Sequence, residues 1–279
     1  MSASDQVVTR AAGRGLVARV LPPWLYGGMA RTVVERSALV SAKIWVIILS
    51  GFCEPVFFLL AFQIGFGALV DEVVGPGGQA MSYVAFVAPA LLAASAMNGA
   101  MFETTYPVYF KLRYTKLYDA MLATPLGPLD IAIGEITWAV LRGGIYSIAF
   151  LGVMAAMGLV TSGWALLLVP VALLISLAFA SVGMACATFI RSVSHFDYIQ
   201  LAAVPMFLFS ATFFPLTVYP ETLQPLVQAS PLYHGVDLMR GLSAGVLDPS
   251  MIGHLGYLLA LAAIGMWATS RRIGSLLLR

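Results

Sequence analysis

Charged side chains inside long apolar runs are the first feature of this sequence that could do chemistry. Glu54 lies near the middle of the first run, and Arg142 lies near one end of the third, with Glu135 seven residues before it on a similar helix face. A carboxylate at the centre of a bilayer costs roughly 2.5–3.5 kcal/mol on insertion scales, so such groups face protein or a water-filled cavity. The three residues are candidates for a transport path. The alternative is a satisfied contact between helices or, for Arg142, a side chain that reaches the membrane interface.

Histidine and cysteine form no recognisable metal-binding pattern. His195, His234 and His254 are 39 and 20 residues apart, without the short helical spacing of a zinc site. Cys53 and Cys186 both lie in apolar runs, and we interpret them as small buried side chains. We therefore expect no metal and no catalytic residue on this chain.

The sequence also lacks a phosphate-binding loop of the P-loop type. That loop requires Gly-Lys followed by Ser or Thr, whereas the three lysines follow Ala42, Phe110 and Thr115. The chain is therefore not expected to bind ATP or any other cofactor. Energy for any transport would have to come from elsewhere.

The composition excludes a soluble protein. Of the 279 residues 60% are hydrophobic and 10% are charged, and the mean hydropathy is +0.91. Soluble domains are about a quarter charged, and disordered chains are poor in apolar residues. The net charge of +2 is too small to indicate a nucleic acid partner. The sequence therefore predicts an all-α integral membrane protein.

Six apolar runs predict six transmembrane helices. The runs cover residues 44–69, 83–102, 133–160, 164–190, 198–219 and 252–270. The stretch 143–190 contains no charged residue and is too long for one span, so we place a turn at 161–163. Lys and Arg gather before the first run, in the second and fourth loops and in the C-terminal tail, whereas the opposite side has only Arg240. The positive-inside rule then predicts that both termini are cytoplasmic.

Two segments on the cytoplasmic side are expected to be helical. Residues 22–43 predict an amphipathic helix at the membrane surface, with apolar residues four apart and Arg31 and Glu35 on the other face. The alternative is a solvated lead-in to the first span. Residues 114–124 predict a short helix that ends before Pro125, because the residue before proline disfavours the helical conformation.

A third segment, residues 218–253, lies on the outer side. It has four prolines but is too apolar for a free loop, so we expect re-entrant helices between the fifth and sixth spans. The chain thus divides into a cytoplasmic N-terminal segment (1–43), a six-span domain (44–273) and a cytoplasmic tail (274–279).

Short motifs follow one another along most of the chain in a characteristic order. They are Glu54-Pro55 with Phe57-Phe58-Leu59-Leu60 and Gly65-Phe66-Gly67, then Phe86-Val87-Ala88-Pro89-Ala90-Leu91-Leu92, Met101-Phe102-Glu103, Tyr118-Asp119-Ala120-Met121-Leu122-Ala123-Thr124-Pro125-Leu126, Gly134-Glu135 with Trp138, Phe213-Phe214-Pro215-Leu216 and Ser230-Pro231-Leu232-Tyr233-His234-Gly235-Val236. In this order they resemble the membrane permease subunits of ABC type-2 exporters. They are most similar to the nodulation-factor exporter permeases and their drug-resistance relatives. Residues 210–212 depart from the family pattern, and residues 1–40 match no part of it.

The resemblance implies a transporter that takes its energy from other subunits. The permease would pair with a second copy or a paralogue in the bacterial inner membrane and dock two cytoplasmic ABC ATPase subunits, which bind ATP and Mg. It would export an amphipathic or hydrophobic substrate, such as a lipid-linked glycan, a glycolipid or a drug. The short cytoplasmic helix would be the ATPase-coupling helix, and its residues are Leu117, Tyr118, Asp119, Ala120, Met121, Leu122, Thr124 and Pro125. The amphipathic helix would belong to the same interface.

Two other functions are compatible with the residues. An ion-coupled carrier or channel would use Glu54 as its proton or ion site. A membrane-embedded enzyme acting on a lipid would need clustered carboxylates or histidines, and the sequence offers only scattered ones.

Overall fold

The computed structural model describes residues 29–43, 45–67, 69–70 and 72–277, and the statements below concern these residues. Helices dominate, as predicted. They are α3 (Ala30–Lys43), α4 (Trp45–Gly65), α5 (Tyr83–Arg113), α6 (Leu117–Leu122), α7 (Pro128–Ala156), α8 (Leu168–Phe189), α9 (Phe196–Leu208), α10 (Gln224–Gln228), α11 (Pro231–Ala244) and α12 (Ser250–Leu277), with short 3-10 turns at Pro76–Gly78, Gly163–Leu167, Val193–His195 and Leu216–Val218. One small hairpin pairs β1 (Val73–Val74) with β2 (Ala80–Met81), Val73 opposite Met81. The all-α membrane fold is confirmed.

Four helical segments of the described chain are long and apolar enough to cross a membrane. They are α5, α7, the segment Gly163–Phe189 that contains α8, and α12. The helices α4 and α9 coincide with the first and fifth predicted runs, but α9 has 13 residues. The number of six spans therefore stays a prediction, as does the division at residues 43 and 273.

The fifth predicted run differs most from the structure. Its helix ends at Leu208, and the chain then follows an irregular path in which Ala211 has a left-handed φ of 55°. Pro205 lies inside the last turn of α9, where its missing N–H weakens the helix. The predicted outer re-entrant segment contains two helices, α10 and α11.

The centre of the bundle is formed by α8, which packs against α5, α7 and α12. Small residues make these contacts close, as is typical of helices in membranes. A Cβ at Gly265 of α12 would lie 2.8 Å from the backbone of Ser181 in α8, and a Cβ at Gly143 of α7 would lie 2.6 Å from the Ser176 hydroxyl. The bundle therefore depends on glycine at these crossings.

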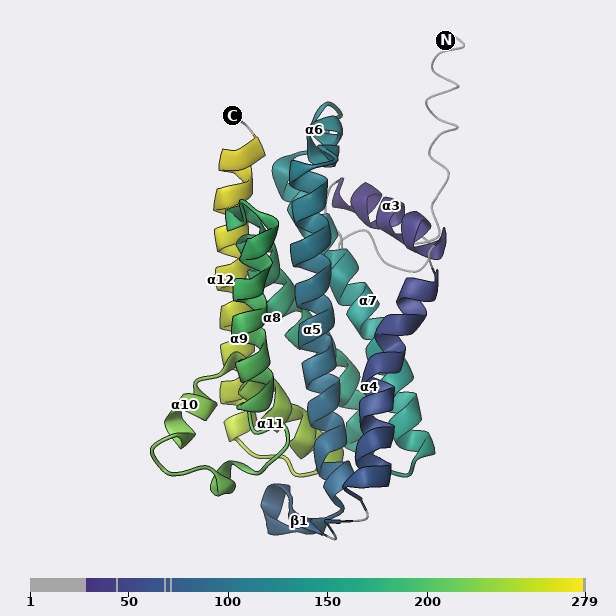
Figure 1. Cartoon of the computed structure of the whole chain (residues 1–279), viewed down its shortest axis with the longest axis vertical. Coiled ribbons are helices and arrows are strands. Elements are labelled where there is room, and N and C mark those ends of the chain that lie inside the picture. The colour runs from purple at the N-terminus through teal and green to yellow at the C-terminus, as the bar shows by residue number, and fades with distance from the viewer. Residues whose placement is uncertain (1–28, 44, 68, 71, 278–279) are drawn as a thin grey trace.

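The two ends of the bundle carry different elements (Figure 1). One end has α3, α6 and the last turns of α12, whereas the other has the β1–β2 hairpin, α10 and α11. The helix α3 lies across the bundle and packs on α7, where a Cβ at Gly134 would lie 2.5 Å from the Cβ of Val33. The amphipathic helix thus begins at Ala30, and its predicted residues 22–28 lie outside the described residues.

Candidate coupling site and intramembrane charges

The short helix α6 is built into the reversal of the chain between α5 and α7. It begins after Lys116, whose φ of 48° is left-handed, and it ends as the N–H of Ala123 donates to the carbonyl of Asp119. Gly127 and Pro128 then start α7, with the Asp130 carboxylate accepting from the Gly127 N–H at 3.0 Å. A helix of one to two turns gains little stability alone, so its position depends on contacts with the bundle.

The predicted coupling residues divide between two faces of α6. Tyr118 is 1% exposed and Met121 is buried, so both pack against the bundle. Leu117 and Leu122 are half-buried at its edges. The exposed residues are Asp119, Ala120, Thr124 and Pro125. A partner at this end of the molecule would therefore meet the Asp119–Ala120 face.

Tyr118 connects α6 to two long helices through Glu135. Its hydroxyl donates to Glu135 Oε1 at 3.1 Å, and Lys111 Nζ of α5 donates to both carboxylate oxygens at 2.8 and 2.7 Å. Glu135 of α7 is 2% exposed. Burial, and then the charge of Glu135, raise the pKa of Tyr118 well above its usual value, so the hydroxyl stays a donor. The three residues form one joint between α5, α6 and α7.

Arg142 is also paired, but with a residue that the sequence did not single out as a partner. It forms an ion pair with Glu103 of α5, and its Nε donates to the hydroxyl of Tyr146 at 2.7 Å. Glu135 and Arg142 thus lie along α7 and each pairs with α5, but through different partners. The sequence held a signal for this, because Glu103 and Lys111 are eight residues apart on the neighbouring antiparallel helix with charges in the complementary order.

Glu54 has no such partner. Its side chain is exposed on α4, and it makes no hydrogen bond or ion pair with any described residue. The next residue, Pro55, is buried, and Phe57 and Phe58 are exposed nearby. An exposed carboxylate in an apolar helix needs a second subunit or water beside it when the helix lies in a membrane.

Arg240, which the sequence placed on the outer side of the membrane, is a buried cation at the other end of the bundle. Arg240 of α11 is 5% exposed and donates to the carbonyls of Phe86, Ala211 and Thr212 at 2.9–3.1 Å. Its guanidinium also lies 3.6 Å from the centre of the Phe86 ring. These bonds satisfy the irregular chain after α9, which explains why that chain need not continue as a helix.

Two of the three histidines are in contact, which their sequence spacing did not indicate. His234 of α11 and His254 of α12 face each other with their Nδ1 atoms 2.6 Å apart. Within the described ranges no group of three or more His, Cys, Asp or Glu side chains could hold a metal ion.

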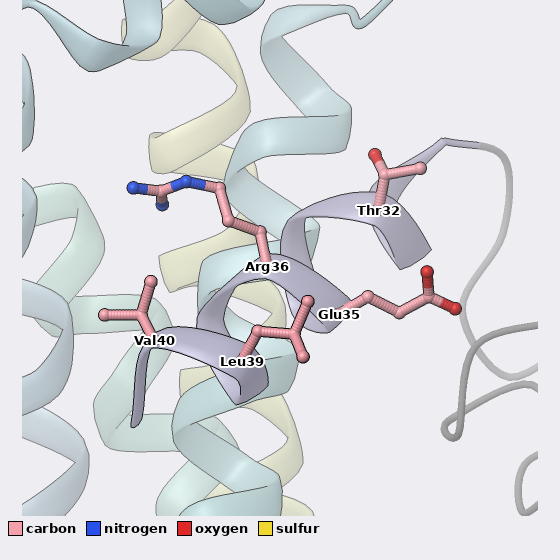
Figure 2. A pocket seen from close by; sticks show the side chains of 5 residues that line it. All are labelled: Thr32, Glu35, Arg36, Leu39 and Val40. Atoms are coloured by element: carbon pink, nitrogen blue, oxygen red, sulfur yellow. The ribbon is translucent and has the colours of Figure 1, made fainter. Parts of the chain in front are cut away.

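A shallow hollow lies near the coupling end. It has a volume of about 330 Å³ and lies on the outward face of α3, lined by Thr32, Glu35, Arg36, Leu39 and Val40. Figure 2 shows these five side chains spread along one side of the helix. Ala30, Val33 and Val34 are buried on its other side. The helix therefore has one face against α7 and one mixed face for a membrane surface or another subunit.

Comparison with known proteins agrees with this architecture. The family described as "ABC-2 type transporter" matches residues 30–243. Nodulation protein J of Rhizobium leguminosarum bv. viciae is 34% identical over 213 residues, which cover 76% of this chain and 80% of that protein. Nodulation protein J of Bradyrhizobium diazoefficiens is 30% identical over 256 residues, which cover 90% of this chain and 94% of the relative. The chain belongs to the ABC-2 type transporter family and is a membrane permease similar to Nodulation protein J.

Proposed function

We propose that this permease is the transmembrane subunit of an ATP-driven exporter, with ATP and Mg bound by two copies of a separate cytoplasmic ABC ATPase. The observation that carries the proposal is the division of α6 into two faces. Asp119 and Ala120 are exposed at the end of the molecule, while Tyr118 is tied to Glu135 and Lys111 inside the bundle. A force applied to the exposed face would be passed to α5 and α7 through this joint.

The exposed polar side chain on α4 supports a second membrane subunit. Glu54 has no partner among the described residues, and a second copy or a paralogue would cover it or enclose water beside it. In that assembly Glu54 and its exposed aromatic neighbours would face the substrate. We therefore propose an amphipathic or hydrophobic cargo, such as a lipid-linked glycan, a glycolipid or a drug, that leaves the cytoplasm or the inner leaflet.

In the proposed orientation, the protein spans a bacterial inner membrane, and α6 and both termini lie on its cytoplasmic side. Basic residues near this end support it, because Lys111, Arg113 and Lys116 follow the apolar part of α5. In this orientation Glu135 and Arg142 serve first to join α5 and α7. A role for Arg142 on the transport path would require the Glu103 pair to open.

Purification of the tagged chain from its own membranes in a mild detergent tests the proposal. Mass spectrometry should find a P-loop ATPase in stoichiometric amount. In lipid vesicles, the complex that contains the unmodified permease should hydrolyse ATP faster than the complex that contains the Asp119→Arg variant. Recovery of the folded chain without an ATPase would contradict the proposal.

The exposure of Glu54 favours one other candidate, an ion-coupled carrier or channel. In vesicles without ATP, such a protein would still transport and would stop when the proton gradient is dissipated. Glu54→Gln should then abolish the ion dependence. Transport that requires ATP and survives dissipation of the gradient excludes this candidate.

A further inference from the structure

The end of the bundle opposite α6 contains a chain of three titratable side chains between α11 and α12. Asp237 and His234 belong to α11, and His254 belongs to α12. The Nδ1 atoms of the two histidines are 2.6 Å apart, and His254 Nε2 lies 3.2 Å from Asp237 Oδ2. The Tyr257 ring stacks on His234 with the ring centres 3.9 Å apart. His254 therefore lies between Asp237 and His234 and contacts both.

The short contact between the two Nδ1 atoms fixes how many protons it can hold. One of the atoms must carry a proton and the other must accept it. With both rings neutral, His254 Nε2–H donates to Asp237 and His234 Nδ1–H donates to His254 Nδ1. Both contacts, between Asp237 and His254 and between His254 and His234, are then hydrogen bonds.

A first added proton leaves this row of hydrogen bonds intact. His254 then carries protons on both nitrogens, and His234 changes tautomer so that its Nδ1 accepts. The Asp237 carboxylate balances the new charge. A second added proton places hydrogen on both Nδ1 atoms, so that neither can accept and two cations face each other.

Two carboxylates, Asp237 and Asp248, lie near His254, but neither can restore the hydrogen bond between two protonated Nδ1 atoms. From α11, Tyr233 and Arg240 face this region together with Asp237, and Arg240 is itself a cation held by backbone carbonyls. From the α12 side, Tyr257 donates to the Ala229 carbonyl at 3.1 Å. Asp248, just before α12, accepts from the Ser250 N–H at 2.8 Å. Burial, and then the neighbouring His254, lower the pKa of His234 below its usual value.

We propose that His234, His254 and Asp237 form a proton-operated latch that holds α11 against α12 with no or one added proton and releases it with two. Release would free the α12 side of α11, while Arg240 keeps α11 attached to the start of α5 and to residues 211–212. The latch requires neither the ATPase nor the substrate. Only the compartment whose pH it senses depends on the proposed orientation.

The geometry favours a proton over a metal ion at this place. Two histidine nitrogens on a tetrahedral zinc, each about 2.0–2.1 Å from it, lie roughly 3.3 Å apart. The observed separation of 2.6 Å is that of a hydrogen bond. No cluster with a third ligand that could complete a metal site exists in the described part of the chain.

Hydrogen exchange of the full chain in lipid nanodiscs tests the latch, with the chain alone or with whatever subunits purify with it. Exchange of residues 232–244 is measured from pH 7.5 to pH 5 and corrected for the intrinsic pH effect. If opening takes up one proton, the opening constant rises about tenfold for each pH unit below an ordinary histidine pKa of about 6.5, until the closed pair itself binds the second proton. His234→Gln and His254→Gln should each remove this rise.

His195 supplies the matched control, since it lies beside Arg191 at the start of α9, away from the pair. His195→Gln should exchange as the unmodified protein does at every pH. Exchange in α11 that does not change with pH in the unmodified protein would overturn the proposal, even if a variant failed to fold. A rise that persists in His234→Gln would also overturn it. Protection that appears only with added Zn²⁺ and disappears with a chelator would replace the latch by a metal site.

Discussion

The two ends of the bundle hold their helices together by different chemistry. Toward the α6 end, the carboxylates of Glu135 and Glu103 form ion pairs with Lys111 and Arg142. At the α11 end, Arg240 donates to backbone carbonyls, and two imidazole rings share a contact that depends on which ring nitrogens carry protons. The difference indicates a rigid joint at the α6 end, where the ATPase would apply force. It indicates an adjustable contact at the other end, where α11 would separate from α12.

Removal of Glu135 should have the largest effect on this comparison. Glu135→Ala leaves Lys111 and the Tyr118 hydroxyl without their acceptor inside the protein. We expect the free energy of unfolding to fall by roughly 3–5 kcal/mol, as for other broken buried pairs. Denaturant unfolding in detergent micelles measures it.

The triple variant Lys111→Met, Glu135→Leu, Tyr118→Phe is the control for that loss. It replaces the whole polar joint by apolar side chains and should recover most of the stability, because buried pairs seldom exceed well-packed apolar residues. If the free energy of unfolding falls equally in the single and triple variants, the loss of stability does not come from the unpaired polar groups.

Arg142, which is partly buried, and Arg240, which is buried, offer a direct comparison of the ends. Arg142→Met leaves the Glu103 carboxylate unpaired and should cost roughly 3–5 kcal/mol. Arg240→Met leaves only neutral carbonyls without a donor and should cost roughly 1–3 kcal/mol. Thermal unfolding of both variants under one condition ranks them. A larger loss for Arg240→Met would contradict the assignment of the charge-paired joint to the α6 end.

Tyr118→Phe should separate the joint from the rest of the bundle. The variant loses one hydrogen bond to a charged group, about 1.5–3 kcal/mol, while the ring keeps its packing. Hydrogen exchange of residues 117–122 should increase, with that of α8 unchanged. Tyr198→Phe is the matched control, since Tyr198 is exposed and its loss of a hydroxyl should change stability by less than about 0.5 kcal/mol. Equal effects of the two variants would remove Tyr118 from the joint.

The smallest effect on stability is expected at Asp119. The side chain is exposed and makes no described contact that its removal would break, so Asp119→Ala should change the free energy of unfolding by less than about 0.5 kcal/mol. Transport should nevertheless fall, because the exposed face of α6 would contact the ATPase. Normal transport by a normally folded Asp119→Ala protein would count against the coupling face.

Local signals in the sequence predicted the elements at the α6 end. Pro125 set the end of the short helix, and apolar runs with few charges placed α5, α7 and α12. The complementary charge order of Glu103 and Lys111 could have supplied their partners. Which residues of α6 turn inward was not readable, because a helix of six residues is positioned by its neighbours and not by its own pattern.

The α11 end depends on contacts between distant parts of the sequence. His234 and His254 meet only because the chain reverses between α11 and α12, and no local spacing encodes that reversal. The early end of α9 has the same kind of cause. Arg240 supplies donors to the carbonyls of residues 211–212, so an apolar stretch that would otherwise need helical hydrogen bonds can be irregular.

Photocrosslinking at the two ends tests the central claim, that the α6 end receives the ATPase, most directly. A photoreactive amino acid replaces Ala120 on the exposed face of α6 or Leu247, which is 53% exposed between α11 and α12. Irradiation of native membranes should give an adduct between a P-loop ATPase and the chain modified at residue 120, and none at residue 247. Adducts at residue 247 alone, or at neither position in a chain that still transports, would contradict the account.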